Sequence, residues 1–279
     1  MRIALGTLLT LAAAIVPAWA TDPAVSPDDL YSGWLKMYNL QFEEAHQIFA
    51  HWKEKYPEDS FGPASNAAAC LFSELARLGA LESELFVDNN RFVNRQKLSP
   101  DPKLKLQFTQ EIDQASRLAD VTLHKSPNDT NALFAQSLIC GLQADYAGLI
   151  DKKNLTALMY TRKGGPYADK LLSVNPNAFD AYLGPGVENY LLSLKSAPVR
   201  VLLRLTGSHT DRAKGLEQLE KTAQHGYYFE PFAKLLLAVA ALRDNNREKA
   251  REILSGLHDR FPDNELYTHE LTRLTSETH

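Results

Sequence analysis

Apolar and polar residues alternate at helical spacing along most of the chain, and prolines interrupt the pattern at intervals. In residues 33–57, a small residue is followed by a second small residue, then by a large apolar residue and a proline. This order predicts two helices that cross closely where the small residues meet, because small side chains let the backbones approach. Proline lacks the N–H of an intrahelical hydrogen bond, so it marks the end of the second helix. The positions are Gly33, Ala45, Phe49 and Pro57, and residues 238–262 repeat their spacing with Ala238, Ala250, Leu254 and Pro262.

Three more helix pairs are predicted between these two regular ones. Their second helices place a small residue twelve positions before Pro127, Pro176 and Tyr227, and the tyrosine replaces the expected proline. We therefore expect about five helix pairs over residues 27–262. The paired small residues in the middle three are Ala67 with Ala115, Ser137 with Gly164, and Gly186 with Gly215.

An amphipathic helix around residues 264–274 should cap the open end of this stack, as terminal units of repeat proteins must. Its leucines (Leu266, Leu271 and Leu274) are expected to face inward, and Glu265 and Glu270 outward.

The spacing resembles the tetratricopeptide repeat (TPR). The segment around Asp211, Gly215, Leu219 and Gly226 is also similar to a stretch of divergent exported proteins of that type. The resemblance implies an all-α, right-handed solenoid whose first helices line a concave face. It also implies a non-catalytic scaffold that holds a protein or peptide. A small-ligand carrier for an organic anion, similar to TPR subunits associated with transporters, is the alternative.

The middle three pairs differ from the outer two by insertions of 36, 15 and 17 residues between the first and second helix. Equivalent loops of stacked repeats lie on one edge, which is often the binding edge. The alternative is that the inserted residues only lengthen the helices and the loops that connect them.

The third insertion, residues 194–209, contains Lys195, Arg200 and Arg204 and no acidic residue. Residues 80–106, 143–157 and 194–209 have formal charges of +1, 0 and +3, in a chain whose net charge is negative. We therefore expect an edge that favours an acidic partner or a membrane surface. A helix packed on the neighbouring unit, with both arginines in water, would have the same sequence.

Candidate binding residues come from the first helices and the insertions. Aromatic residues at helical spacing are typical of a core, but first helices of this repeat type also line the groove. The candidates are Tyr146, Tyr182, Glu188, Asn189, Tyr190, Arg200, Arg204 and Tyr228.

The first twenty residues have the features of a signal peptide. Arg2 precedes an uncharged apolar run, and Ala18 and Ala20 supply the small residues that signal peptidase requires. We expect cleavage after Ala20, a mature domain over residues 21–279, and a soluble periplasmic or secreted protein. Cys70 and Cys140 could pair in that compartment, but spacing alone does not decide it.

The sequence contains no motif that indicates catalysis or a cofactor. His46 and His51 have the wrong spacing for a metal-binding helix, and no paired cysteines or glycine-rich phosphate loop occurs. Without Arg2 the chain has 29 basic and 34 acidic residues, which argues against a nucleic-acid partner. We expect no enzyme, no metal and no cofactor; an enzyme whose site is assembled from distant residues is the remaining alternative.

Overall fold

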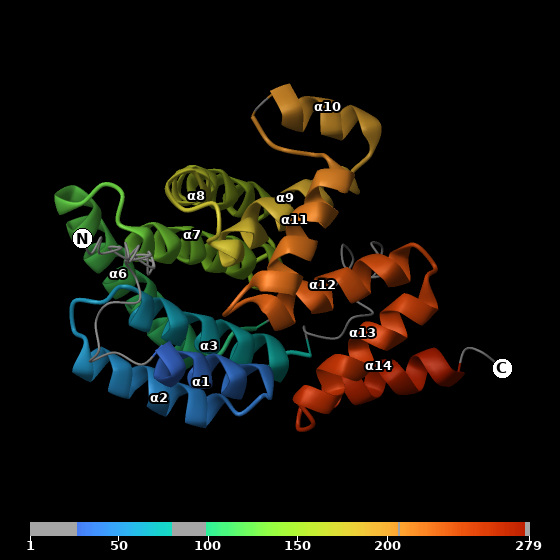
Figure 1. Cartoon of the computed structure of the whole chain (residues 1–279), viewed down its shortest axis with the longest axis horizontal. Coiled ribbons are helices and arrows are strands. Elements are labelled where there is room, and N and C mark those ends of the chain that lie inside the picture. Colours follow the sequence, from blue (N-terminus) through green and yellow to red (C-terminus); the bar gives the residue numbers. More distant parts are fainter. Residues whose placement is uncertain (1–26, 80–98, 206, 277–279) are drawn as a thin grey trace, which may run out of the picture.

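The computed structural model describes residues 27–79, 99–205 and 207–276, and every regular element in this part of the chain is a helix (Figure 1). Each long helix of the stack packs mainly on the helices before and after it in the chain. The prediction of an all-α fold is therefore confirmed. The predicted signal peptide, residues 1–20, lies outside the described residues, as does most of the first insertion.

The helices form the five predicted pairs and a closing helix. The pairs are α1 (Pro27–Tyr38) with α2 (Phe42–Lys55), α3 (Phe61–Arg77) with α6 (Pro102–Lys125), α7 (Thr130–Asp145) with α8 (Asn154–Val174), α9 (Leu183–Ser193) with α11 (Arg212–His225), and α12 (Glu230–Arg243) with α13 (Arg247–Arg260). The remaining elements are the π-turn η2 (Tyr146–Ile150), the 3₁₀ turn η3 (Phe179–Tyr182), α10 (Ala197–Leu205) and the closing helix α14 (Glu265–Ser276).

Local sequence accounts for where many of these helices begin. The side chains of Asp101, Asp129, Asp211 and Asn246 each accept a hydrogen bond from a backbone N–H in the first turn of the following helix. Such caps satisfy N–H groups that have no partner inside the helix.

Close crossings occur where the spacing predicted them, and the clearest joins α9 to α11. A methyl group added to Gly215 would lie 2.6 Å from the backbone nitrogen of Tyr190 and 3.0 Å from the carbonyl oxygen of Gly186. In α1, a methyl group added to Gly33 would overlap the ring of Phe49. These glycines are required because backbone or ring atoms occupy the space that a side chain would need.

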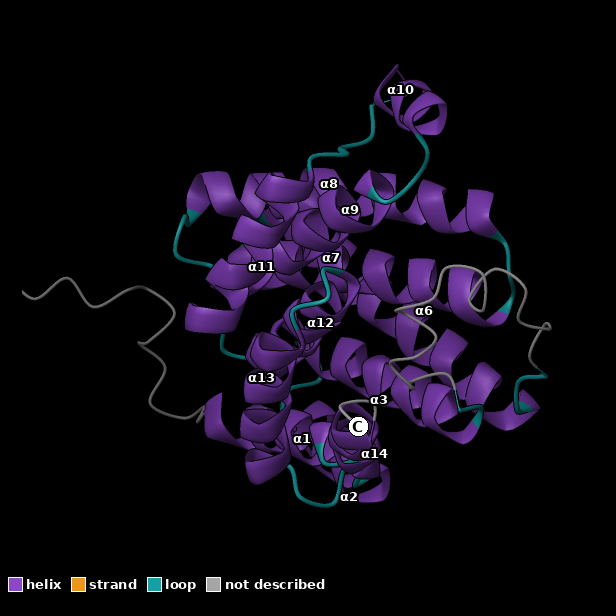
Figure 2. Ribbon diagram, turned by 90° about the vertical axis from the view of Figure 1, so that its right-hand side faces the viewer, coloured by secondary structure: helices purple, strands orange, loops and turns teal. Residues whose placement is uncertain are grey.

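The insertions take three different forms, so the expectation of three equivalent loops was wrong. The described part of the first insertion lengthens α3 and α6, and residues 80–98 lie outside the description. The second insertion lies within α7, η2 and α8, a helix of 21 residues, so it mainly lengthens helices. Among the described parts of the insertions, only the third leaves the stack, as α10, which stands outside the other helices in both views (Figures 1 and 2).

The two ends of the stack meet, which the sequence did not predict. Asn264 Nδ2, just before α14, donates to the carbonyl oxygen of Tyr38 at 2.8 Å. The side chain of Asn39 donates to the carboxylate of Asp263 and accepts the backbone N–H of the same residue. Helices α1 and α14 accordingly lie near each other in Figure 1. The chain therefore curls until its last pair touches its first.

Aromatic side chains fill the inside of this curl. The ring centroids of neighbouring members lie 4.8 to 6.2 Å apart, and the members come from α1, α3, α7 and the link before α12. Rings at these distances bury large apolar area and pack edge to face or offset. This aromatic hub consists of Trp34, Phe61, Phe134, Tyr228 and Phe229.

Helix α14 caps the stack with one departure from expectation. Leu274 is buried and Leu266 and Leu271 are partly buried, but Glu270 is buried too, where an outward position was expected. Arg273, one turn later, donates to its carboxylate at 2.8 Å. This pairing lets the acid lie against the stack beside Tyr267.

Candidate functional site

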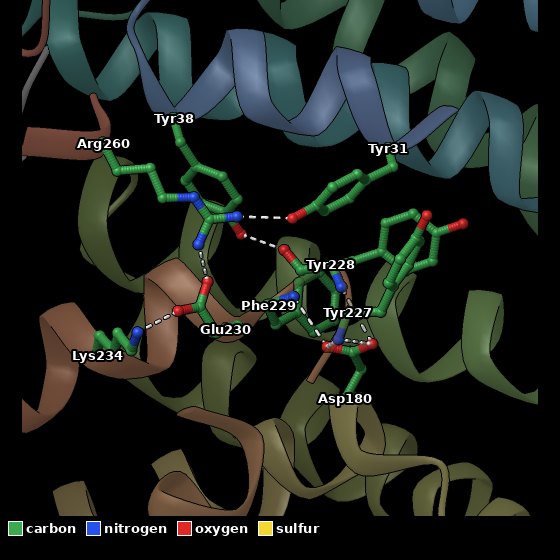
Figure 3. Close-up of polar contacts among 9 residues, drawn as sticks. All are labelled: Tyr31, Tyr38, Asp180, Tyr227, Tyr228, Phe229, Glu230, Lys234 and Arg260. Atoms are coloured by element: carbon green, nitrogen blue, oxygen red, sulfur yellow. Dashed lines mark hydrogen bonds and ion pairs between the residues drawn. The ribbon is translucent and has the colours of Figure 1, made fainter. Parts of the chain in front are cut away.

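The link between α11 and α12 is held by one carboxylate (Figure 3). Asp180, in η3, accepts hydrogen bonds from the backbone N–H groups of Tyr227 at 2.9 Å, Tyr228 at 3.2 Å and Phe229 at 2.8 Å. Burial raises the pKa of the Asp180 carboxyl, and the three N–H donors oppose that increase. Asp180 thus fixes the segment that carries two rings of the aromatic hub.

Helix α1 contacts this link through its tyrosines. The hydroxyl of Tyr38 donates to the carbonyl oxygen of Tyr228 at 2.8 Å, and the ring of Tyr31 stacks on Tyr227 at 4.4 Å. Arg260 bonds the hydroxyl of Tyr31 at 2.6 Å and pairs with Glu230 (Figure 3). These contacts join α1, α12 and α13.

Three of the predicted groove residues lie together but are buried in the joint between α9 and α11. Asn189 Nδ2 donates to Gln218 Oε1 at 3.0 Å, and its Oδ1 accepts the N–H of Asp211 at 3.1 Å. Glu188 accepts the N–H of His209 at 3.2 Å. Tyr190 is buried, and the guanidinium of Arg212 lies 5.9 Å from its ring centroid. These side chains hold α11 on α9, so they do not line an open groove.

Arg200 lies close to this joint without entering it. Its guanidinium donates to the carbonyl oxygens of Ser193 at 3.2 Å and Lys195 at 3.1 Å, at the C-terminal end of α9. A cation at a helix C-terminus meets carbonyl groups that have no partner inside the helix. Arg204 belongs to α10, and its side chain lies outside the described part of the structure.

The remaining candidates are tyrosines in three separate places. Tyr146 in η2 is buried, stacks on Phe108 at 4.9 Å, and has its pKa raised to about 12 by burial. Tyr182 is partly exposed, with the ammonium of Lys221 5.0 Å from its ring centroid. Tyr228 belongs to the aromatic hub. The eight candidates therefore do not form one site.

A buried polar chain joins α2, α3 and α6. Glu111 Oε1 accepts hydrogen bonds from Lys53 at 2.5 Å and from Asn66 Nδ2 at 2.8 Å. Asn66 Oδ1 can only accept, so His46 Nδ1, 2.6 Å away, must carry a proton. Each of these groups is used to hold helices together, and the contacts span three helices of the first two units.

Exposed large apolar side chains concentrate in the three units with insertions. Among the described residues, ten of the eleven that are well exposed lie between positions 106 and 205. Isolated exposed apolar side chains are normal, whereas a contiguous exposed apolar patch marks an interaction surface. The ten are Leu106, Val121, Leu155, Met159, Val174, Leu191, Val199, Val201, Leu202 and Leu205.

Three of these side chains lie near a contact between α6 and the link that leads into α8. Lys105 Nζ lies 3.9 Å from Asp151 Oδ1, so the first turn of α6 is beside the link that leads into α8. Leu106, Leu155 and Met159, which follow directly on these two segments, are between 60% and 80% exposed. We call these three residues the α6–α8 surface.

Two hollows between helices of the described structure are small. One, of about 40 Å³, lies between α1, α3, α12, α13 and α14 and is mostly apolar. The other, of about 120 Å³, lies between α11, α12 and α13. Pockets for small organic ligands usually measure about 300–1,000 Å³, so neither hollow supports the carrier alternative.

Within the described residues, no group of three or more histidine, cysteine or acidic side chains could hold a metal ion. Cys70 and Cys140 are buried and unbonded to each other, so the pairing left open by the sequence is not formed. No described helix is both long and apolar enough to span a bilayer.

Sequence reasoning missed Asp180 and the α6–α8 surface. A single acid in a short turn has no spacing signal, because its partners are backbone groups nearly fifty residues later. The exposed apolar residues of α6 and α8 follow the same helical spacing as buried ones. Spacing therefore does not tell which of them face outward.

Comparison with known proteins gives limited similarity. No protein-family model and no curated protein matches the chain. A solved structure of a thermophilic TPR protein from Thermus thermophilus is similar over 89% of this chain and 97% of that chain. The identity is 14% and the TM-score 0.45, values that do not by themselves assign a family. The described chain is thus an all-helical stack of five helix pairs, and its repeat spacing resembles that of the tetratricopeptide repeat.

Proposed function

We propose that the chain is an exported, non-catalytic scaffold that holds a protein or peptide partner on the α6–α8 surface. The observation that carries the proposal is the exposure of Leu106, Leu155 and Met159 near the contact between α6 and the link that leads into α8. Burying such side chains against a partner is favourable, because each removes apolar area from water.

The inside of the curl is a weaker candidate for the same role. TPR-type scaffolds are expected to hold a peptide against their first helices, but here the aromatic hub occupies that space. Glu188, Asn189 and Tyr190 are also committed to the joint between α9 and α11. A partner therefore has better access to the outside of the middle units.

Cross-linking of the tagged protein in a detergent extract of its native envelope, read by mass spectrometry, tests the proposal. A partner should cross-link to residues 102–159, and Leu155→Glu/Met159→Glu should abolish those cross-links. Leu202→Glu/Leu205→Glu, which places the same two charges on α10, is the matched control and should keep them. The proposal fails if no protein cross-links to this range, or if both variants behave alike.

A further inference from the structure

Helix α10 is attached to the stack at its two ends and along neither side. At its start, Arg200 bonds the carbonyl oxygens of Ser193 and Lys195. Beyond its end, Ser208 Oγ accepts from Arg162 of α8 at 3.2 Å, and the N–H of His209 bonds Glu188. Among the described residues, no other helix packs along α10. Its position is therefore defined, and Val201, Leu202 and Leu205 remain largely exposed.

The apolar side of α10 faces outward. Leu205 follows Leu202 by three residues and Val201 by four, so it shares a helix face with each of them, and the three side chains are 56–80% exposed. Arg200 projects from the opposite side, toward the end of α9. An exposed apolar stripe on an otherwise unsupported helix is stable only if something else buries it.

The charge of the segment indicates what buries it. Residues 194–209 contain Lys195, Arg200 and Arg204 and no acid, while the chain as a whole has a formal charge of −4. An anionic surface would attract this segment and repel the acidic remainder, which would orient the protein with α10 toward the surface.

The shape of this element favours a lipid surface over a protein groove. Figure 2 shows α10 as the outermost helix on its side of the molecule, beyond α8 and α9, and Figure 1 agrees. A flat bilayer can reach such a projecting stripe without meeting the rest of the stack. A helix with an exposed apolar stripe, in a segment whose only charges are basic, has the composition of helices that lie in the lipid interface.

We propose that α10 is an interfacial helix that docks the protein on an anionic lipid bilayer. The side chains of Val201, Leu202 and Leu205 enter the boundary between headgroups and acyl chains. The positive charge of the segment attracts this end of the molecule to the anionic headgroups.

Co-sedimentation of the purified mature chain with vesicles tests this inference. The protein should pellet with vesicles of phosphatidylethanolamine and phosphatidylglycerol and much less with phosphatidylcholine vesicles, and added salt should weaken the binding. Leu202→Glu/Leu205→Glu should lower the bound fraction about tenfold or more, because two apolar anchors are replaced by charges that the lipid repels.

Leu155→Glu/Met159→Glu is the matched control, since it makes the same change at equally exposed positions of α8. It should bind vesicles as the unmodified chain does. Circular dichroism melting of both variants verifies that they fold, which their exposed positions favour.

Three results would overturn the inference: no binding to anionic vesicles, equal binding to neutral ones, or equal loss in both variants. Cross-linking of α10 to a protein in a detergent extract, without vesicle binding, would assign the stripe to a protein groove instead. Because vesicles contain no protein, failure here leaves the cross-links at the α6–α8 surface unaffected, and the reverse also holds.

Discussion

The carboxylate of Asp180 accepts the backbone N–H of Phe229 at 2.8 Å, across 49 positions of the chain. The same carboxylate bonds the two residues before Phe229. One side chain therefore organises the turn on which the ends of the stack meet.

Replacing Asp180 by alanine should lower the free energy of unfolding by roughly 2–4 kcal/mol, because three backbone donors lose a charged acceptor in a buried place. Urea denaturation measures the change. Asp211→Ala is the control, since that side chain caps one helix through a single N–H bond and should cost only about 1 kcal/mol. Equal effects of the two variants would show that Asp180 is an ordinary local cap.

Gly215→Ala should destabilise the protein by roughly 1–3 kcal/mol, because a strained contact with backbone cannot relax as a flexible side chain would. The new methyl group would lie 2.6 Å from the nitrogen of Tyr190. Gly256→Ala is the matched control in α13, where nothing lies within 4 Å of the added carbon. It should be neutral or stabilise by up to about 1 kcal/mol. Thermal melts of both variants decide whether the α9–α11 crossing requires glycine.

The two thiols should be unreactive in the folded protein at neutral pH. Burial raises the pKa of Cys70 to about 12, with Glu111 adding to the increase, and burial raises the pKa of Cys140 to about 11. Both thiols therefore remain protonated, and the thiolate is the reactive form.

Titration with a thiol reagent should detect neither cysteine in the native chain and both after unfolding in urea. Cys70→Ser and Cys140→Ser variants assign the signals. Rapid native labelling of either single-cysteine variant would contradict the burial described for it.

Asp145 should make stability fall as pH rises. Burial raises the pKa of its carboxyl to about 7, above the value of about 4 in an unfolded chain. The folded state therefore binds the proton more tightly between these two values. The stabilisation is complete below about pH 4 and is lost as pH rises through about 7.

Unfolding midpoints measured from pH 4 to pH 8 should show this slope in the unmodified chain and a weaker one in Asp145→Asn. Asp169→Asn, at an exposed position of α8, is the control and should retain the slope. A profile unchanged by Asp145→Asn would mean that other groups cause it.

The sequence predicted the features that depend on contacts between helices adjacent in the chain. Gly186 and Gly215 meet where their spacing placed them, and Pro57, Pro127, Pro176 and Pro262 follow second helices that end one or two residues earlier. These features repeat along the chain because each pair packs on the next in the same way, so one template finds them all.

The features that the sequence did not predict depend on contacts between residues far apart in the chain. The contact of Tyr38 with Tyr228 follows from the accumulated curvature of the whole stack, which no local spacing encodes. Glu188 and Asn189 were expected in a groove because polar residues are usually exposed, but partners on α11 and the segment before it satisfy them in the interior. Glu270 became buried for the same reason.

The meeting of the two ends has a consequence for how the chain folds. In an open repeat array, each unit depends only on its neighbours, so terminal units can fray or be removed at small cost. Here α1 cannot complete its contacts until the link before α12 and the segment that follows α13 are in place, some 190 to 226 residues later. Contacts this distant in sequence slow folding and link distant segments into one transition. The protein should therefore unfold as a unit, and shortening it from either end should weaken both ends together.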